Sequence, residues 1–369
     1  MKHTHIILTA LLLAPLARAA AAQTQVPAKP DSNSVASPVL LAGNEIKPAP
    51  AGLVCFGFPP RGWDTVFNCM IHKLKWEELE PELGQYEAGF RKLDEMLKRA
   101  GDKGLFVHLL IVCGENSPAW LKQQVGTVTV FDAGGLAYNP LAQGGRTCAR
   151  WWDPAFGKAY SRMQQALAER YDAHPRLAAV GMNRCMSFWP EPFMRQLREA
   201  KNRQNLREAG YTATLDKAAQ SETLRTHARC WTNTCSSIAL NPYQELAGTG
   251  DSWKQNMEYT AAFIQEAVQL LGKRLILQND SFVSERSQLG EDYWRMYDLM
   301  KDSGAILGLQ PRGTTRETIG DARKLIEAAI RQGAAYLELV NIYEKSEIPK
   351  EEFAAFDKQL EANAARCRR

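Results

Sequence analysis

The chain has 369 residues, of which 45% are apolar, so it can form one large domain or two ordinary ones around a substantial core. Its 45 basic and 41 acidic residues leave a net charge of +4, and no run of five like charges occurs. This pattern lacks the electrostatic signature of a nucleic-acid-binding protein, so no nucleic-acid partner is expected.

The N-terminal residues 1–22 have the pattern of an export signal. An apolar run over residues 6–16 precedes small residues that offer cleavage after Ala19 or Ala22. We expect a periplasmic or secreted mature chain without stable membrane insertion, because this run is short for a bilayer span; an uncleaved anchor helix is the alternative. Residues 23–50 contain five prolines and little periodicity, which predicts a flexible linker.

Short apolar runs occur after residue 50, and helical periodicity separates most of them. Strands that are apolar throughout, each followed by a crossover helix, are typical of a parallel sheet covered by helices. We therefore predict an α/β fold, a (β/α)8 TIM barrel over residues 51–369, with residues 351–365 as a closing helix. The eight runs are residues 52–58, 65–74, 104–112, 177–183, 236–241, 274–279, 305–310 and 335–340.

The connection between the first two runs contains Pro59, Pro60 and Gly62 and is too short for a helix. It predicts an abbreviated first βα unit. An open doubly wound sheet is the alternative, but no glycine-rich nucleotide-binding motif follows any run. No cofactor is expected.

The eight cysteines fit an exported protein but are too sparse for a disulfide scaffold. Cys230 and Cys235 are close enough to close a small loop, and we predict a disulfide between them. No CxxC motif or Cys/His cluster with zinc spacing occurs, so no metal site is expected.

Polar and aromatic residues come after the C-terminal ends of the runs, where a barrel places its chemistry. Such a set suits a carbohydrate, because aromatic rings stack on sugar faces while carboxylates and amides bind hydroxyls. Each residue has a structural alternative, as a satisfied core side chain or as a turn residue that ends a strand. The substrate-binding candidates are Trp76, His108, Trp189, Asn241, Tyr243, Asn279, Gln310, Arg312 and Tyr343.

Two segments carry a family resemblance. The first is "KWEELEPELGQYEAGFRKLDEML", followed by "GLFVHLLI" and "SPAWL", and the second is "WWDPAFGKAYSRMQQALAERYDAHPRLAAV". Over roughly residues 65–195 the chain resembles clan A barrel glycoside hydrolases, especially the family 42 β-galactosidases. The resemblance implies a glycosidase with a carbohydrate substrate and places Trp76 at the substrate face, while Glu80 is expected to brace the adjoining loop.

Hydrolysis of a glycosidic bond needs two carboxyl groups. The resemblance places the acid/base near the end of the fourth strand, where Glu191 stands in "SFWPEPF", although Pro190 replaces the asparagine usual in the clan. It places the second carboxylate at the end of the seventh strand, where this chain has Gln310. Glu338, in "AYLELVNIYE", is the nearest glutamate on a strand and becomes the tentative nucleophile; an ion pair with a barrel cation is its alternative role.

These residues leave two function classes open. The first is an exported glycoside hydrolase that acts on a polysaccharide or oligosaccharide by a retaining mechanism. The second is a non-catalytic carbohydrate-binding barrel that has lost one carboxylate, which Gln310 would explain.

Overall fold

The computed structural model describes residues 45–131, 145–185, 187, 191–247, 252–313, 320–339 and 346–367. Contacts divide the chain into two units, Met1–Pro38 and Val39–Arg369. The expected signal and most of the expected linker lie outside the described residues, which all belong to the second unit.

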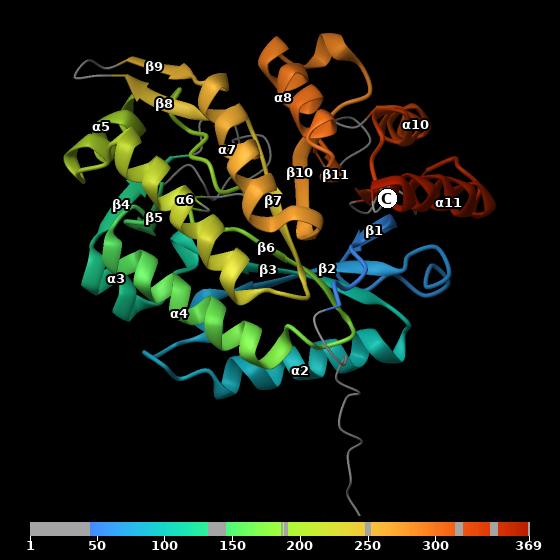
Figure 1. The fold of residues 1–369 in the computed structure, drawn as a ribbon, viewed down its shortest axis with the longest axis horizontal. Helices are drawn as coiled ribbons and strands as arrows, with labels where there is room; N and C mark the ends of the chain where they lie inside the picture. The colour runs from blue at the N-terminus through green and yellow to red at the C-terminus, as the bar shows by residue number, and fades with distance from the viewer. Residues whose placement is uncertain are drawn as a thin grey trace, which may run out of the picture. The chain divides into compact units, whose positions relative to one another are not determined.

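Eight parallel strands close into a barrel, in the order β1-β12-β11-β10-β7-β6-β3-β2 (Figure 1). Each predicted apolar run overlaps one of these strands, which confirms the predicted fold class. The parallel direction brings the C-terminal ends of all eight strands to one end of the barrel. The strands are β1 (Gly52–Phe56), β2 (Cys69–Lys75), β3 (Phe106–Val112), β6 (Leu177–Gly181), β7 (Cys235–Ala239), β10 (Leu275–Phe282), β11 (Ile306–Pro311) and β12 (Tyr336–Leu339).

Helices surround the barrel, and two antiparallel hairpins extend from it (Figure 1). Residues 57–68, all of them described, contain no helix, so the first βα unit is abbreviated as predicted. No helix within the described ranges is both long and apolar enough to cross a bilayer. The helices are α1 (Trp76–Leu79), α2 (Glu87–Asp102), α3 (Ala119–Val125), α4 (Pro154–Tyr171), α5 (Ala200–Glu208), α6 (Ala213–Cys230), α7 (Met257–Leu271), α8 (Glu291–Asp302), α10 (Ala322–Gln332) and α11 (Lys350–Cys367), with short 3-10 turns η1 (Gly114–Asn116), η3 (Gly272–Arg274) and η4 (Arg286–Gln288); the hairpins are β4 (Thr127–Val130) with β5 (Arg146–Ala149) and β8 (Gln244–Ala247) with β9 (Ser252–Gln255).

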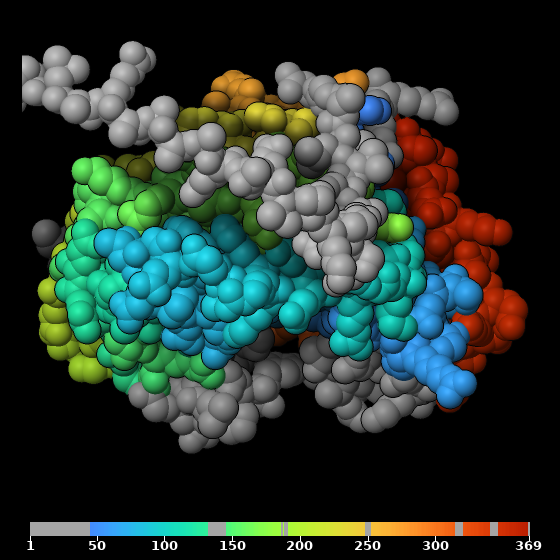
Figure 2. All heavy atoms as spheres, turned by 90° about the horizontal axis from the view of Figure 1, so that it is seen from below, coloured from blue at the N-terminus to red at the C-terminus, as the bar shows by residue number. Residues whose placement is uncertain are grey.

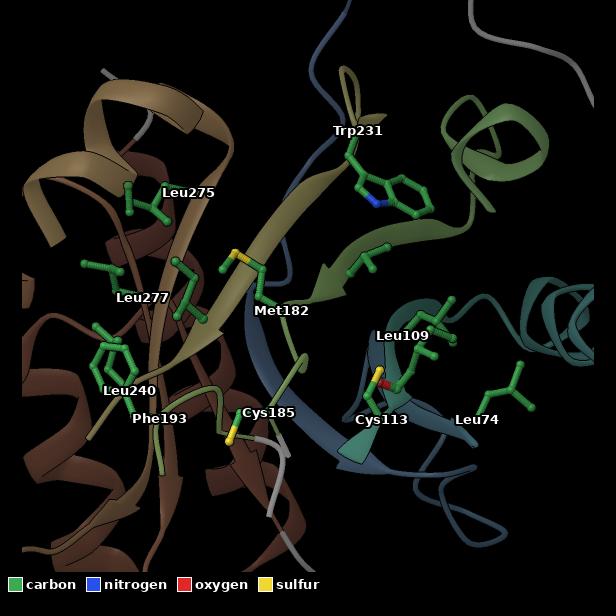
Figure 3. Close-up of a cluster of buried hydrophobic side chains, with 14 of the residues drawn as sticks. Leu74, Leu109, Cys113, Met182, Cys185, Phe193, Trp231, Leu240, Leu275 and Leu277 are labelled. Carbon is green, nitrogen blue, oxygen red and sulfur yellow. The ribbon is translucent and has the colours of Figure 1, made fainter. Parts of the chain in front are cut away.

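Alternation along the strands produces two apolar layers. On β10, Leu275 and Leu277 point outward into the cluster that packs against the helices (Figure 3). Ile276, between them, belongs to a separate inner cluster with Val54, Cys69, Ile71, Leu110, Ala179, Cys235, Ile306 and Tyr336. Because side chains on a strand alternate between its two faces, the next alternate residues also face the barrel interior, until on β10 a register shift between Asn279 and Phe282 interrupts the pattern.

The C-terminal helix α11 lies beside the first strand, as predicted for a closing helix. Asp357 Oδ1 accepts a hydrogen bond of 2.6 Å from the backbone N–H of Leu53. Gly52 has a φ of 78°, and a Cβ there would overlap the Asp357 carboxylate, so this position needs glycine. Figure 2 shows red atoms of the late chain next to blue atoms of the early chain. The ring of Trp63 packs edge-on against that of Phe353 in α11, with 5.5 Å between the ring centres.

The structure contains no disulfide between Cys230 and Cys235, contrary to the prediction from their spacing. Cys230 is the last residue of the outer helix α6, whereas Cys235 opens β7 and packs in the inner cluster. The two residues are close along the chain, but their elements send the two side chains into different layers.

Candidate active site

The barrel interior becomes polar toward the C-terminal ends of the strands. On β10 the inner positions after Ile276 are Gln278 and Asp280, and on β12 the inner position after Tyr336 is Glu338. Lys73 occupies the corresponding end of β2 and is exposed, with its Nζ 5.1 Å from the centre of the Phe56 ring. Carboxyl groups therefore gather at the end of the barrel where such folds hold their active sites.

Glu191 comes after the fourth barrel strand, β6, and is only 3% exposed. Its Oε1 accepts a hydrogen bond of 2.6 Å from Arg195 Nη1. Its Oε2 is buried and has no hydrogen-bond partner among the residues that the structure describes. Burial alone would lower the pKa of Arg195, but the charge of Glu191 and the contact with Tyr293 hold this pKa above its usual value, so the guanidinium remains charged.

The Arg195 guanidinium is itself held in place. Its Nη2 donates to the Tyr293 hydroxyl at 3.4 Å, and that hydroxyl donates to Asn241 Oδ1 at 3.2 Å. Tyr293 comes from α8 and Asn241 from the end of the fifth strand, β7. Three segments thus fix one oxygen of Glu191 and leave its second oxygen available for a ligand.

Asp280 stands on the sixth strand, β10, and is half-buried. Its Oδ1 accepts a hydrogen bond of 2.6 Å from Gln278 Nε2, while its buried Oδ2 has no partner within the described part of the chain. Burial, followed by the negative charge of Glu191, raises the pKa of Asp280 to about 7. Gln278, Lys73 and Arg195 oppose this rise only in part.

Glu338 lies on the eighth strand, β12, and is 1% exposed. Burial and then the charge of Asp280 raise its pKa well above the usual range, against the effects of Lys73 and Gln278. The charge of Glu191 therefore affects the pKa of Asp280, and the charge of Asp280 affects that of Glu338. The carboxyl predicted as the nucleophile is the most deeply buried of the three.

His108 lies in the same interior, beside Glu338. Its Nε2 is 2.6 Å from Ser237 Oγ, and its Nδ1 is 3.8 Å from Glu338 Oε1. Burial lowers the pKa of His108 to about 3, so the ring is neutral near pH 7 and the contact with Glu338 is not an ion pair. His108 is a core residue in this structure, which was one of its two expected roles.

Trp76 is fully buried, away from any exposed surface. Its ring packs edge-on against Phe156 at 5.4 Å, and its Nε1 donates to Glu80 Oε2 at 2.9 Å. Glu80 Oε1 also accepts from the backbone N–H of Gly84 at 2.9 Å, so Glu80 braces the loop after α1. The tryptophan that the sequence placed at the substrate face therefore anchors this loop instead.

The other predicted binding residues divide into three groups. Tyr243 is buried and donates to Asp216, and Asn279 points outward to bind the Leu240 carbonyl and the Tyr297 hydroxyl, so both serve the fold. Gln310 is half-buried at an inner position of the seventh strand, β11, and Arg312 is exposed beyond it. Trp189 and Tyr343 lie outside the described residues.

The sequence-based candidates omitted three residues that surround Glu191 and Asp280, namely Lys73, Arg195 and Tyr293, and did not include Asp280 as an acid/base candidate. Alternation could have pointed to two of them, because Lys73 follows Cys69 and Ile71 at inner positions and Asp280 follows Ile276. Arg195 and Tyr293 carry no local signal. Within the described ranges, no group of three His, Cys, Asp or Glu side chains is arranged to hold a metal ion.

Comparison with known proteins bears on this arrangement. Residues 66–221 match the glycoside hydrolase family 42 model, described as beta-galactosidase. This match covers less than half of the chain and includes Glu191. It confirms the resemblance seen in the sequence and supports the conclusion that the protein is a glycosidase. A search of curated proteins gave no match.

Solved structures of glycosidases also resemble the chain. Endo-glycoceramidase II from Rhodococcus sp. shares 13% identity over 79% of this chain and 73% of its own, with a TM-score of 0.47. The beta-galactosidase from Rahnella sp. R3 shares 15% identity over 86% of this chain and 57% of its own, with a TM-score of 0.49. Because the sequence identities and the TM-scores are this low, no residue role or substrate of these proteins is assigned to this chain.

Proposed function

We propose that this protein is an exported glycoside hydrolase that cleaves O-glycosidic bonds in a polysaccharide or oligosaccharide. The observation that carries the proposal is the surroundings of Glu191, which is buried in the segment after the fourth strand, β6. Arg195 donates a hydrogen bond to one of its oxygens, and the other oxygen has no partner among the described residues. A buried, half-satisfied carboxylate is costly for the fold, which is expected where a group is kept for chemistry. The family match spans this residue.

The electrostatics of the site suit this reaction. Glycoside hydrolysis needs one carboxyl that carries a proton and a second that is ionised. Glu191 receives a hydrogen bond from the Arg195 guanidinium, whereas burial and the charge of Glu191 raise the pKa of Asp280 to about 7. Carboxyl groups placed in contrasting surroundings are typical of acid/base pairs.

Export and retention of configuration are further parts of the proposal. Residues 1–22 support export, which fractionation of cells expressing the full chain tests, with recovery only in the cytoplasm as the contrary result. The family match supports retention. Retention requires that the first sugar product keep the anomeric configuration of the substrate, which proton NMR during early turnover measures.

A second candidate function is a carbohydrate-binding barrel without catalysis. Gln310 favours it, because an amide stands at the inner position of the seventh strand where the resemblance leads one to expect a carboxylate. An amide neither donates a proton as an acid nor forms the covalent sugar ester that a retaining mechanism requires.

Turnover of wild type and Glu191→Gln on a panel of polysaccharides and aryl glycosides separates these functions. The exposed Glu258→Gln on α7 is a matched control, since it makes the same change far from the barrel interior. We expect Glu191→Gln to lose at least about 10²-fold in rate while it still binds the sugar in calorimetry. Binding without turnover by the wild type would establish the second candidate, and near-parental turnover by Glu191→Gln would exclude the proposed site.

A further inference from the structure

We infer that Asn241, just past the fifth strand β7, donates a hydrogen bond to a hydroxyl group of the bound sugar. Tyr293 and Arg195 act as positioning residues that hold the Asn241 amide in register with Glu191. This inference rests on the proposed glycosidase function and deepens it, because it makes one free hydroxyl of the sugar a requirement for recognition.

Asn241 faces the barrel interior. Ser237 on β7 points inward, where its Oγ contacts His108 Nε2 at 2.6 Å. Leu240 belongs to the outer cluster (Figure 3), and its backbone N–H donates to the Gln278 carbonyl at 2.7 Å, so the pairing with β10 continues past the end of β7. Alternation then turns Asn241 inward, and this residue is only 1% exposed. Its side chain is therefore buried at the end of the barrel where the strands have their C-terminal ends.

A chain of three hydrogen bonds links Asn241 to Glu191. Arg195 Nη1 donates to Glu191 Oε1 at 2.6 Å, and Arg195 Nη2 donates to the Tyr293 hydroxyl at 3.4 Å. The third contact joins the Tyr293 hydroxyl to Asn241 Oδ1 at 3.2 Å. The guanidinium has donors only, so the Tyr293 oxygen accepts from Arg195 and its single hydrogen is left for the amide. The amide must receive that hydrogen on Oδ1, which leaves Nδ2 as its free end.

Both ends of this chain carry a polar atom without a partner. Asn241 Nδ2 is buried and has no hydrogen-bond acceptor among the described residues, and Glu191 Oε2 is likewise buried and unpartnered there. Buried polar groups are normally hydrogen-bonded, so such atoms are expected where a ligand supplies the missing partner. One network thus fixes a hydrogen-bond donor and a carboxyl oxygen relative to each other.

A neutral hydroxyl fits the Asn241 donor better than an anionic group does. A hydroxyl oxygen accepts from an amide N–H. A carboxylate or phosphate would enter the end of the barrel that already holds the carboxyl groups of Glu191, Asp280 and Glu338. Like charges at such a site repel, which favours the uncharged hydroxyl of a sugar.

Glycosides that lack single hydroxyls test this inference. For a glycoside that the wild type hydrolyses, the kcat/KM of the parent divided by that of each monodeoxy analogue measures the contribution of the missing hydroxyl. We expect Asn241→Ala to lose about 10-fold in kcat/KM on the parent. On the analogue without the contacted hydroxyl it should match the wild type, so its ratio for that analogue falls about 10-fold.

The positioning residues have their own variants. Tyr293→Phe and Arg195→Met remove the contacts that orient the amide, so both should lower the same ratio although neither side chain touches the sugar. Tyr293 is half-buried and the Arg195 side chain is 26% exposed, so neither change empties the core. Tyr297→Phe is the matched control: it removes a hydroxyl from the same helix, α8, whose partner Asn279 faces outward, and should keep the wild-type ratio.

The possible results are distinguishable. An equal loss of Asn241→Ala on the parent and on every analogue overturns the contact with the sugar, and a wild-type ratio in Tyr293→Phe overturns the positioning role. If Asn241→Ala does not fold, the ratio in Tyr293→Phe decides. An inactive Glu191→Gln leaves the glycosidase proposal standing in each case. If the wild type binds a sugar without hydrolysing it, only the glycosidase proposal fails, and the same ratio taken from dissociation constants decides the role of Asn241; a wild type that neither binds nor hydrolyses any sugar overturns both.

Discussion

The buried histidine His227 makes the stability of this barrel depend on pH. Replacing this one residue measures its share of that dependence. Its ring is fully buried, with Nδ1 3.1 Å from Ser236 Oγ and Nε2 2.9 Å from the Tyr160 hydroxyl. Burial lowers its pKa to about 3 from the ordinary 6.5. Between about pH 3 and 6.5 the imidazole is therefore neutral in the folded chain, whereas the same side chain binds a proton in the unfolded chain.

Linkage between protonation and folding gives the sign and size of the effect. Since the folded pKa lies below the unfolded one, the stabilisation is complete above pH 6.5 and is lost as the pH falls toward 3. Between about pH 5.5 and 4 the unfolded state holds one more proton at this site, so the free energy of unfolding falls by about 1.4 kcal/mol per pH unit. His108 has the same shift, and the two sites together remove about 10 kcal/mol by pH 3, comparable with a whole domain's stability.

His227→Gln keeps a hydrogen-bonding side chain and removes the titration. We expect it to reduce the pH slope of the unfolding free energy by about 1.4 kcal/mol per unit between pH 5.5 and 4, measured by urea unfolding at several pH values. Ser236→Ala is the control, because it removes one partner of the ring and lowers stability at every pH without removing the titrating group. An unchanged slope in His227→Gln would show that the folded state also binds the proton.

Two further substitutions test the role of Glu80 in bracing the loop after α1 and the packing of Gly308 against Tyr336. Glu80→Gln disturbs the bonds to Trp76 Nε1 and the Gly84 N–H, so we expect a loss of about 1–3 kcal/mol in urea unfolding with kcat within a few-fold of wild type; a collapse of kcat with unchanged stability would place Glu80 in the chemistry. Gly308→Ala puts a Cβ into the Tyr336 ring and should cost about 1–3 kcal/mol. Gly290→Ala, where the added Cβ meets nothing within 4 Å, should leave thermal stability nearly unchanged, and equal effects of the two would contradict the packing described.

The strands were predictable because their signal is local. Each buried parallel strand needs a short apolar run, and all eight runs overlap a strand of the barrel. The short connection between the first two strands was also predictable, because its two prolines and glycine leave no room for a helix. The closing helix α11 was recognisable from its own sequence.

The directions of side chains beyond the strand ends could not be predicted from the local sequence. Trp76 directly follows β2, but the chain turns there into the helix α1, which carries the indole beneath the loop and against Phe156. Tyr243 lies beyond the end of β7 at Ala239 and turns instead toward Asp216 on α6. A position just past a strand therefore places a residue near the mouth of the barrel but leaves its direction open.

Within a strand, by contrast, alternation fixes the direction, and the choice between Asn279 and Asp280 depends on it. Ile276 faces inward, so Gln278 does as well, and its hydrogen bond to Asp280 shows that this carboxyl lies on the same side. Asn279 faces the outer layer, where it binds Tyr297. The same count places Gln310 and Glu338 inside the barrel. An acid missing from one inner position can then be supplied by the inner position of a neighbouring strand, because the parallel strands present both at the same end. The glutamine on the seventh strand therefore does not by itself exclude catalysis, because its neighbours β10 and β12 carry the carboxyl groups of Asp280 and Glu338.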